Sequence, residues 1–215
     1  MWIVFDLDDT LIDTSGSVTP FKLGEALRAM EKAGLVSGPG AMEELVALNR
    51  VLPKTSASVR QFALKRGGGE AVVAAGLEAL SSPLPDDFRV VLRPGAKEIL
   101  DYCRTRHTTA LVTMGYAPFQ REKFKKAGLD ESLFSTIAIP SDSIKKSIFQ
   151  SLAERWKAPP REVVVIGDRI DLDLEPAREL GFITVHVRWG RGQQVATPDW
   201  VNHSIAELSE LMNIL

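Results

Sequence analysis

Hydrophobic residues in this chain form short runs that alternate with amphipathic segments. Runs rich in Val, Ile and Ala predict β-strands at residues 2–5, 108–113, 135–139, 162–166 and 182–187. Such near-continuous apolar runs are typical of parallel strands that are buried on both faces. Helical periodicity lies before each of the later runs or between them, at residues 96–104, 118–127, 142–156 and 171–180. The alternation predicts an α/β fold, a doubly wound, Rossmann-like parallel sheet.

One long stretch breaks this alternation. Between the first and second predicted strands the periodicity is helical throughout, at residues 20–33, 41–51, 58–65 and 70–80. Glycine- and proline-rich segments separate these helices, and the stretch ends in the linker "SSPLPDD". We therefore expect an α/β core of residues 1–13 and 88–215, with a helical domain of residues 14–87 inserted after the first strand.

Composition and charge narrow the possible partners. The formal net charge of the 215 residues is -2, which gives no broad attraction to nucleic acid or to an anionic membrane. No apolar stretch approaches the roughly 20 residues that span a bilayer, and the first residues lack the charged region of a signal peptide. Cys103 is the single cysteine, so no internal disulfide can form. We expect a cytoplasmic protein with no nucleic-acid and no membrane partner.

Polar residues that could carry chemistry follow several of the predicted strands. Asp6 and Asp8 come directly after residues 2–5, Thr113 ends the run "TTALVT", and Asp168 follows "EVVVIG". The carboxyl ends of parallel strands are where open α/β sheets bind ligands. In an extended segment Asp6 and Asp8 would point to the same side. Clustered carboxylates repel one another, so the group indicates a cation site, although a solvated turn at a strand end is the simpler alternative.

Four motifs in order resemble the haloacid dehalogenase-like (HAD) superfamily of phosphotransferases. "DLDDTL" resembles its Asp-x-Asp-x-Thr signature, "LVTMG" its second motif, and "VVVIGDRIDLDLEPARELG" its acidic fourth motif. Lys145 in "DSIKKSIFQSL" stands where the family often has Lys-Pro, with Lys146 in place of the proline and Lys123 as a weaker candidate. The helical insertion lies where family members carry a type 1 cap. Asp9 occupies a position that is often Gly, and Met114 one that is often Asn.

The resemblance implies a Mg²⁺-dependent phosphatase of a small phosphorylated metabolite. Asp6 would attack phosphorus, and Asp8 would protonate the leaving oxygen and then activate water. Asp6, the main-chain carbonyl of Asp8 and Asp168 would hold the metal. Thr113 and Lys145 would bind the phosphoryl oxygens, and Asp173 would support Lys145 or the water around the metal.

Three other functions are compatible with parts of this pattern. A phosphoglucomutase-like phosphotransferase would use the same site but return the phosphoryl group to a sugar. Halide displacement is disfavoured, because that chemistry needs neither the proton donor Asp8 nor a metal. A catalytically idle, phosphate-binding regulatory protein is disfavoured, because it would have no reason to keep such a costly cluster of charge. The sequence does not identify the substrate.

Overall fold

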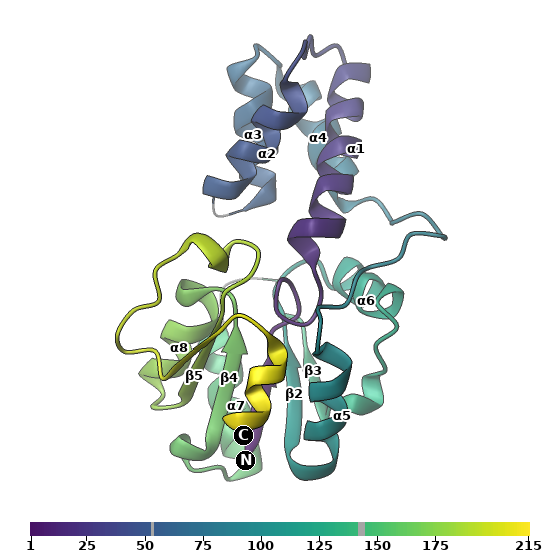
Figure 1. The fold of residues 1–215 in the computed structure, drawn as a ribbon. Helices are drawn as coiled ribbons and strands as arrows, with labels where there is room; N and C mark the ends of the chain where they lie inside the picture. Colours follow the sequence, from purple (N-terminus) through teal and green to yellow (C-terminus); the bar gives the residue numbers. More distant parts are fainter. Residues whose placement is uncertain (53, 142–144) are drawn as a thin grey trace. The chain divides into compact units, whose positions relative to one another are not determined.

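The chain divides into two compact units. A computed structural model describes residues 1–52, 54–141 and 145–215, and its first unit comprises Met1–Ser15 with Asp86–Leu215. The second unit is Gly16–Pro85, the helical part that carries the labels α1 to α4 in Figure 1. These boundaries lie two residues from those predicted at each junction.

The first unit contains a parallel β-sheet, which confirms the predicted fold class. Within the described residues the sheet has six strands in the order β3-β2-β1-β4-β5-β6. Every neighbouring pair is parallel. The strands are β1 (Trp2–Phe5), β2 (Thr108–Val112), β3 (Thr136–Ala138), β4 (Val163–Gly167), β5 (Ile183–Val187) and β6 (His203–Ile205). The prediction missed β6, because "HSI" is short and two of its three residues are exposed.

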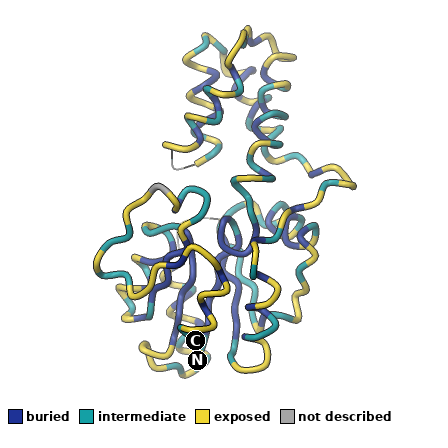
Figure 2. Tube along the Cα trace, in the orientation of Figure 1, coloured by how far each residue is buried: buried dark blue, intermediate teal, exposed yellow. Residues whose placement is uncertain are grey.

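Helices cover the sheet and bury its central strands. Figure 2 shows the central strands as continuous buried trace. Val4 and Val165 pack with Phe149 and Leu152 of α7 on one face, while Ile3 and Phe5 are fully buried on the other by the alternation of a strand. The helices of this unit are α5 (Ala96–Arg106), α6 (Ala117–Lys126), α7 (Lys145–Trp156) and α8 (Glu175–Glu179). Short 3₁₀ segments lie at Glu131–Leu133, Pro160–Glu162, Gly192–Gln194 and Leu208–Asn213.

Two predicted helices differ from the structure at their beginnings. Residues 142–144 of the predicted helix 142–156 lie outside the described residues, and α7 begins at Lys145. The predicted helix 171–180 begins instead as a π-helical turn, Ile170–Leu174, before α8. The wider turn arises because the amide of Leu174 reaches back to the carbonyl of Arg169. A π-helical turn of this kind commonly marks a functional position.

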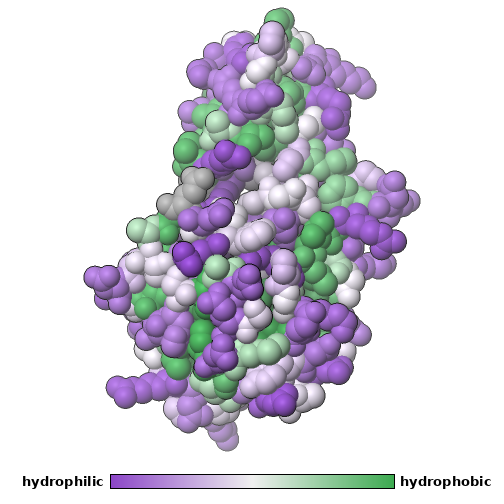
Figure 3. Space-filling model, in the orientation of Figure 1, coloured by the Kyte–Doolittle hydropathy of each residue, from purple (hydrophilic) through white to green (hydrophobic). Residues whose placement is uncertain are grey.

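The second unit is a helical bundle with its own core. A π-helical turn, Thr14–Val18, leads into α1 (Thr19–Lys32), which is followed by α2 (Ala41–Val51), α3 (Thr55–Lys65) and α4 (Glu70–Ser81). Leu23, Leu45 and Phe62 are among its fully buried side chains. No helix in the described ranges is long and apolar enough to cross a membrane. The face drawn in Figure 3 is largely hydrophilic, with apolar side chains scattered among the polar ones.

Gly76 lets α4 pack closely against α1 and α3. A Cβ atom at this position would lie 2.7 Å from Cγ1 of Val59 and 2.9 Å from Cγ of Met30. Both neighbours are fully buried and have little room to move. Gly24 in α1 is the matched contrast, because a Cβ there would meet only the end of Arg28, at 3.4 Å.

We predict that the same substitution has opposite effects at these two glycines. Gly24→Ala should stabilise the protein by up to about 1 kcal/mol, since alanine is the better helix former. Gly76→Ala should destabilise it by about 1–3 kcal/mol despite the same gain, because the methyl group overpacks the bundle. Urea unfolding of both variants measures the difference. Equal stabilisation by both would contradict the close packing around Gly76.

Candidate active site

The predicted site residues converge because three of the strands that carry them are neighbours. β1 lies between β2 and β4, with Phe5 aligned with Leu111 on one side and with Ile166 on the other. Asp6, Thr113 and Asp168 follow directly after these three strands. All three residues are buried. The register of the sheet therefore brings two carboxylates and a hydroxyl to one edge.

Lys145 connects two of the carboxylates. It is the first residue of α7, and its Nζ donates to Oδ1 of Asp6 at 2.7 Å and, by a short contact, to Oδ1 of Asp173. All three side chains are at most 9% exposed. Gly167 makes room for this arrangement, because a Cβ there would lie 2.4 Å from Oδ2 of Asp173. The ammonium group is thus fixed between two buried carboxylates.

Asp8 belongs to a separate set of contacts. Its Oδ1 accepts a hydrogen bond from Oγ1 of Thr14 at 2.5 Å and a short one from Nζ of Lys123. Its Oδ2 accepts from Nε2 of Gln120 at 2.9 Å. The Asp8 side chain is 30% exposed, whereas that of Lys123 is 5% exposed. Asp8 is therefore held firmly and remains accessible to a small molecule.

Asp9 shapes the loop that follows β1, between Asp6 and Ser15. It adopts the left-handed backbone region, with φ of 57°, which explains why a glycine suits this position. Its carboxylate accepts from the amide of Ser15 at 2.7 Å and from the Ser15 hydroxyl at 2.5 Å. Aspartate is one of the few residues that tolerate this conformation, because it can form such local hydrogen bonds.

Burial and mutual repulsion set the charges of the cluster. Burial raises the pKa of Asp6 to about 7, although Lys145 acts in the opposite direction. Burial, together with the charges of Asp173 and Asp6, raises the pKa of Asp168 well above its usual range. Burial would also raise the pKa of Asp8, but the charge and hydrogen bond of Lys123, together with the hydrogen bonds from Thr14 and Gln120, outweigh it and lower that pKa. The lysines thus leave Asp168 with the least compensated charge of the three.

The carboxylates fit a divalent metal ion. One oxygen from each of Asp6, Asp168 and Asp173 lies within 4.8 Å of the other two, and all three residues are buried. Carboxylate oxygens are the ligands that Mg²⁺ prefers. The raised pKa values of Asp6 and Asp168 show that burial and repulsion disfavour their ionised forms. A dication would relieve that strain.

The two alternatives for the motif lysine lie in different places. Lys146 is half exposed and pairs with Glu179 at 2.6 Å, away from Asp6. Lys123 is buried but contacts Asp8. Only Lys145 of these three contacts Asp6. The assignment of Lys145 to the third motif is thus the one that the contacts favour.

Gln120 is a site residue that the sequence analysis missed. It is 3% exposed and contacts both Asp8 and Thr113 through Nε2. A signal was present in the sequence. Gln120 and Lys123 share one helical face with Phe124, so two polar residues occupy positions that should be apolar in an amphipathic helix.

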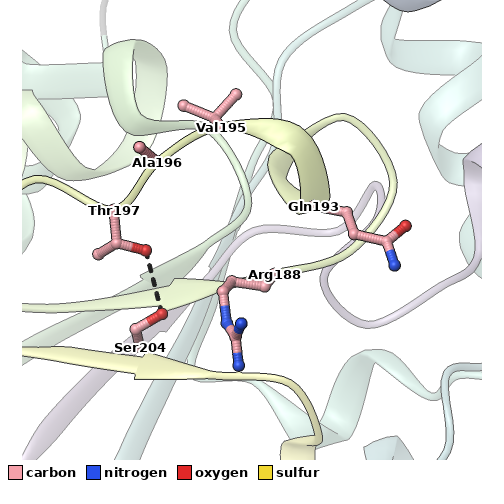
Figure 4. Close-up of a pocket in the computed structure, with 6 residues that line it drawn as sticks. All are labelled: Arg188, Gln193, Val195, Ala196, Thr197 and Ser204. Carbon is pink, nitrogen blue, oxygen red and sulfur yellow. Dashed lines mark hydrogen bonds between the residues drawn. The ribbon is translucent and has the colours of Figure 1, made fainter.

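A separate pocket of about 500 Å³ lies beside β5 and β6. Figure 4 shows its lining residues, with a hydrogen bond of 3.1 Å between the hydroxyls of Thr197 and Ser204. Of the described residues that line it, Arg188 is the charged one. None of the predicted site residues lines this pocket. It therefore lies outside the carboxylate cluster.

The fold and the cluster define an α/β core with a candidate active site at the strand ends. A family model described as haloacid dehalogenase-like hydrolase matches residues 1–181. The chain belongs to this family. The resemblance drawn from the four motifs is confirmed.

Relatives of this chain are named as phosphatases. The glyceraldehyde 3-phosphate phosphatase of Pyrococcus furiosus is 28% identical over 99% of this chain and 92% of its own length. The protein of the same name from Methanopyrus kandleri is 30% identical over 90% of this chain and 86% of its own length. The phosphoglycolate phosphatase of Synechococcus elongatus is 30% identical over 58% of this chain and 60% of its own. The chain is therefore an enzyme of the phosphatase kind within its family.

Solved structures share the fold. The HAD-hydrolase YfnB from Bacillus subtilis, solved bound to magnesium, matches with a TM-score of 0.73 and 17% identity, over 100% of this chain and 97% of that one. A HAD-superfamily hydrolase from Geobacter sulfurreducens also matches with a TM-score of 0.73, at 16% identity over 100% and 95% of the two chains. These likenesses extend through both units of the chain.

We predict that the metal-free protein loses stability as the pH rises. A carboxyl group whose pKa is higher in the folded state than in the unfolded state binds its proton more tightly when folded. For Asp6 the pKa rises from 3.8 to about 7, so its stabilising contribution is present below that window and lost through it. Asp168 shifts in the same direction. Melting temperatures in a chelator, compared at about pH 5 and about pH 8, measure the loss.

Asp168→Asn isolates the part that comes from Asp168. Without metal, the variant should melt above the wild type at about pH 8, by about 2–4 °C for each kcal/mol regained, and the gap should shrink at about pH 5. Millimolar Mg²⁺ should raise the melting temperature of the wild type but not of the variant. Asp171→Asn is the control, since Asp171 lies in the same motif but pairs with Arg169 at the surface. A wild-type melting temperature that changes with neither pH nor Mg²⁺ would contradict the electrostatic explanation.

Proposed function

We propose that the protein is a Mg²⁺-dependent phosphatase that hydrolyses a small phosphorylated metabolite through an aspartyl-phosphate intermediate. The observation that carries the proposal is the Lys145 ammonium group, held between Asp6 and Asp173 at the strand ends. A nucleophile that attacks an anionic phosphoryl group needs nearby positive charge and a fixed direction of approach. Lys145 provides both to Asp6.

In the first step a carboxylate oxygen of Asp6 forms a bond to phosphorus. The bond from phosphorus to the leaving oxygen breaks, and the protonated form of Asp8, which its lowered pKa makes the minor form near neutral pH, gives that oxygen its proton. The accessible side chain of Asp8 suits this exchange of protons with a small molecule. The hydroxyl of Thr113, which lies at the adjacent strand end, donates to an oxygen of the transferred group.

In the second step water attacks the phosphorus atom of the intermediate. Asp8, now ionised, takes a proton from this water, and the bond between phosphorus and Asp6 breaks. Asp6, Asp168 and the main-chain carbonyl of Asp8 would hold the metal, with Asp173 placed to support it. Bound Mg²⁺ supplies positive charge that offsets the negative charge of the phosphoryl oxygens.

We propose a short phosphorylated metabolite as the substrate, and residues 16–85 as a cap domain that selects it. The support for the substrate is that the relatives covering most of this chain are named for glyceraldehyde 3-phosphate or phosphoglycolate. The support for the cap is that this unit interrupts the core directly after the nucleophile loop.

The direct test is phosphate release from a panel of esters in the presence of Mg²⁺. The panel contains glyceraldehyde 3-phosphate, 2-phosphoglycolate and hexose phosphates, with a chelator as the control. We expect release from a two- or three-carbon ester and its loss on chelation. Conversion of one hexose phosphate to its isomer without release of phosphate would instead identify a mutase.

We predict that Asp6→Asn abolishes turnover and preserves the fold. Asparagine keeps the shape of the side chain but is a poor nucleophile, so the rate should fall by at least about a thousandfold. Phosphate release measures the loss, and circular dichroism checks the fold. Asp101→Asn, a change of the same type in an exposed ion pair with Lys97, should have wild-type activity. Normal turnover by folded Asp6→Asn would remove Asp6 from the nucleophile's role.

We predict a different signature for Asp8→Asn. An alkyl phosphate has a poor leaving group that needs a proton, whereas p-nitrophenolate leaves with little help. The variant should therefore slow alkyl esters at least about tenfold more than p-nitrophenyl phosphate. Initial rates on the two esters give this ratio. An equal loss on both would argue against Asp8 as the proton donor.

A further inference from the structure

Helix α6 buries two polar side chains that no step of the proposed mechanism uses. Gln120 is 3% exposed and Lys123 is 4% exposed. Burying a charge or an amide is costly unless good partners replace water. The partners of both side chains are the groups at the ends of β1 and β2. The contacts indicate that α6 serves the active site.

Gln120 joins the two strand ends through one nitrogen atom. Its Nε2 lies 2.9 Å from Oδ2 of Asp8, 2.9 Å from Oγ1 of Thr113 and 2.5 Å from the carbonyl oxygen of Met114. The carboxylate and the carbonyl can only accept, so the amide nitrogen must face them. Gly115 leaves space for the side chain, because a Cβ there would lie 3.3 Å from Nε2.

This geometry determines what the Thr113 hydroxyl can do. Because an amide nitrogen has no free acceptor, the contact with Gln120 uses the Thr113 oxygen as the acceptor. The hydroxyl hydrogen of Thr113 is then left to donate elsewhere. An oxygen of a phosphoryl group is an acceptor of the required kind.

The same geometry distinguishes the two oxygens of Asp8. Oδ1 accepts hydrogen bonds from the hydroxyl of Thr14 and from the charged ammonium group of Lys123. Among the described residues, Oδ2 accepts a hydrogen bond from Gln120 alone. The Nε2 atom of Gln120 has two hydrogens to share among three acceptors. Oδ2 is therefore the more weakly held oxygen. It is the one from which a proton can be passed without breaking the contact to the lysine.

We propose that Gln120 and Lys123 are positioning residues that act through Asp8 and Thr113. Lys123 anchors Oδ1 of Asp8, so that Oδ2 faces the leaving oxygen, and Gln120 ties Oδ2 to the Thr113 hydroxyl. The inference rests on the proposed phosphatase function and adds to it a mechanism for aligning proton transfer with phosphoryl binding. The cost is visible in Gln120, whose Oε1 is buried and finds no donor among the described residues.

The two residues should give different kinetic signatures. Loss of Lys123 frees Asp8 but leaves Thr113 in place, so it should impair alkyl esters far more than p-nitrophenyl phosphate. Loss of Gln120 should do the same and also weaken binding of a phosphoryl mimic, because the Thr113 hydroxyl loses its orientation. A residue with only a structural role would lower both rates together or lower the melting temperature alone.

The experiment compares Gln120→Met and Lys123→Met with the wild type. Their controls are Gln150→Met and Lys125→Met, which make the same changes at exposed positions. The measurements are kcat/KM for an alkyl phosphate and for p-nitrophenyl phosphate, the affinity for beryllofluoride with Mg²⁺, and the melting temperature. Lys123→Arg is the conservative variant that retains the charge.

We expect the ratio of kcat/KM for the alkyl phosphate to kcat/KM for p-nitrophenyl phosphate to fall at least about tenfold in both methionine variants. In Lys123→Arg this ratio should recover in part. Beryllofluoride affinity should fall only in Gln120→Met. If Lys123→Met does not fold, the comparison of Gln120→Met with its control Gln150→Met tests the inference. Folded variants that keep the wild-type ratio would overturn the inference and leave the proposed function standing. A wild type that releases no phosphate from either ester would overturn the proposed function, and the inference with it.

Discussion

The buried ion pairs of Lys145 are the interaction on which the rest of the site depends. The side chain of Lys145 is 4% exposed, and the side chains of Asp6 and Asp173 that balance its charge are 9% and 2% exposed. Removing one partner from such a group costs about 3–5 kcal/mol, because it leaves an uncompensated charge in the interior. Asp6, Asp173 and Lys145 come from three separate elements, so this requirement ties β1, the turn after β4 and α7 to one another.

Two glycines allow carboxylates of this region to approach the backbone closely. Gly167 ends β4 without a side chain, and the carboxylate of Asp173 occupies the space where a Cβ would lie. Gly190 does the same for Asp9, since a Cβ there would be 2.2 Å from Oδ2 of Asp9. Each carboxylate thus approaches a strand end or loop more closely than any other residue type would allow. These glycines serve close approach, and substitution at either would displace a carboxylate.

The parts of the fold that were predictable are those with a local signal. The runs of β1 and β4 have no polar interruption, and β2 has only two β-branched threonines at its start, so the existence of these strands and their order along the chain could be predicted directly. The carboxyl ends of these strands then follow from the parallel arrangement. β6 could not be found in this way, because its pairing comes from β5 and not from its own composition. The π-helical turn before α8 was hidden for a similar reason, since it depends on how Asp173 and its neighbours bond to Arg169.

The side-chain partners of the site were harder to predict than its members. Asp6 and Asp168 are marked by the strands that they follow, but which lysines contact Asp6 and Asp8 depends on where α7 and α6 pack. Lys145 and Lys146 are adjacent in sequence, yet one is buried on Asp6 and the other is half exposed on Glu179. Helical geometry explains the difference, since neighbouring residues on a helix point about 100° apart, and only tertiary packing decides which one faces inward.

Two lysines compensate the charges of different carboxylates in the site. Lys145 compensates the nucleophile Asp6, and Lys123 compensates Asp8, so each carboxylate has its own cation. Asp168 contacts no lysine among the described residues, and burial and its acidic neighbours raise its pKa. A site with fully paired carboxylates would have little affinity for a further cation. Within the described part of the chain Asp168 is the carboxylate whose ionised form is least compensated, so a divalent metal gains most from binding there.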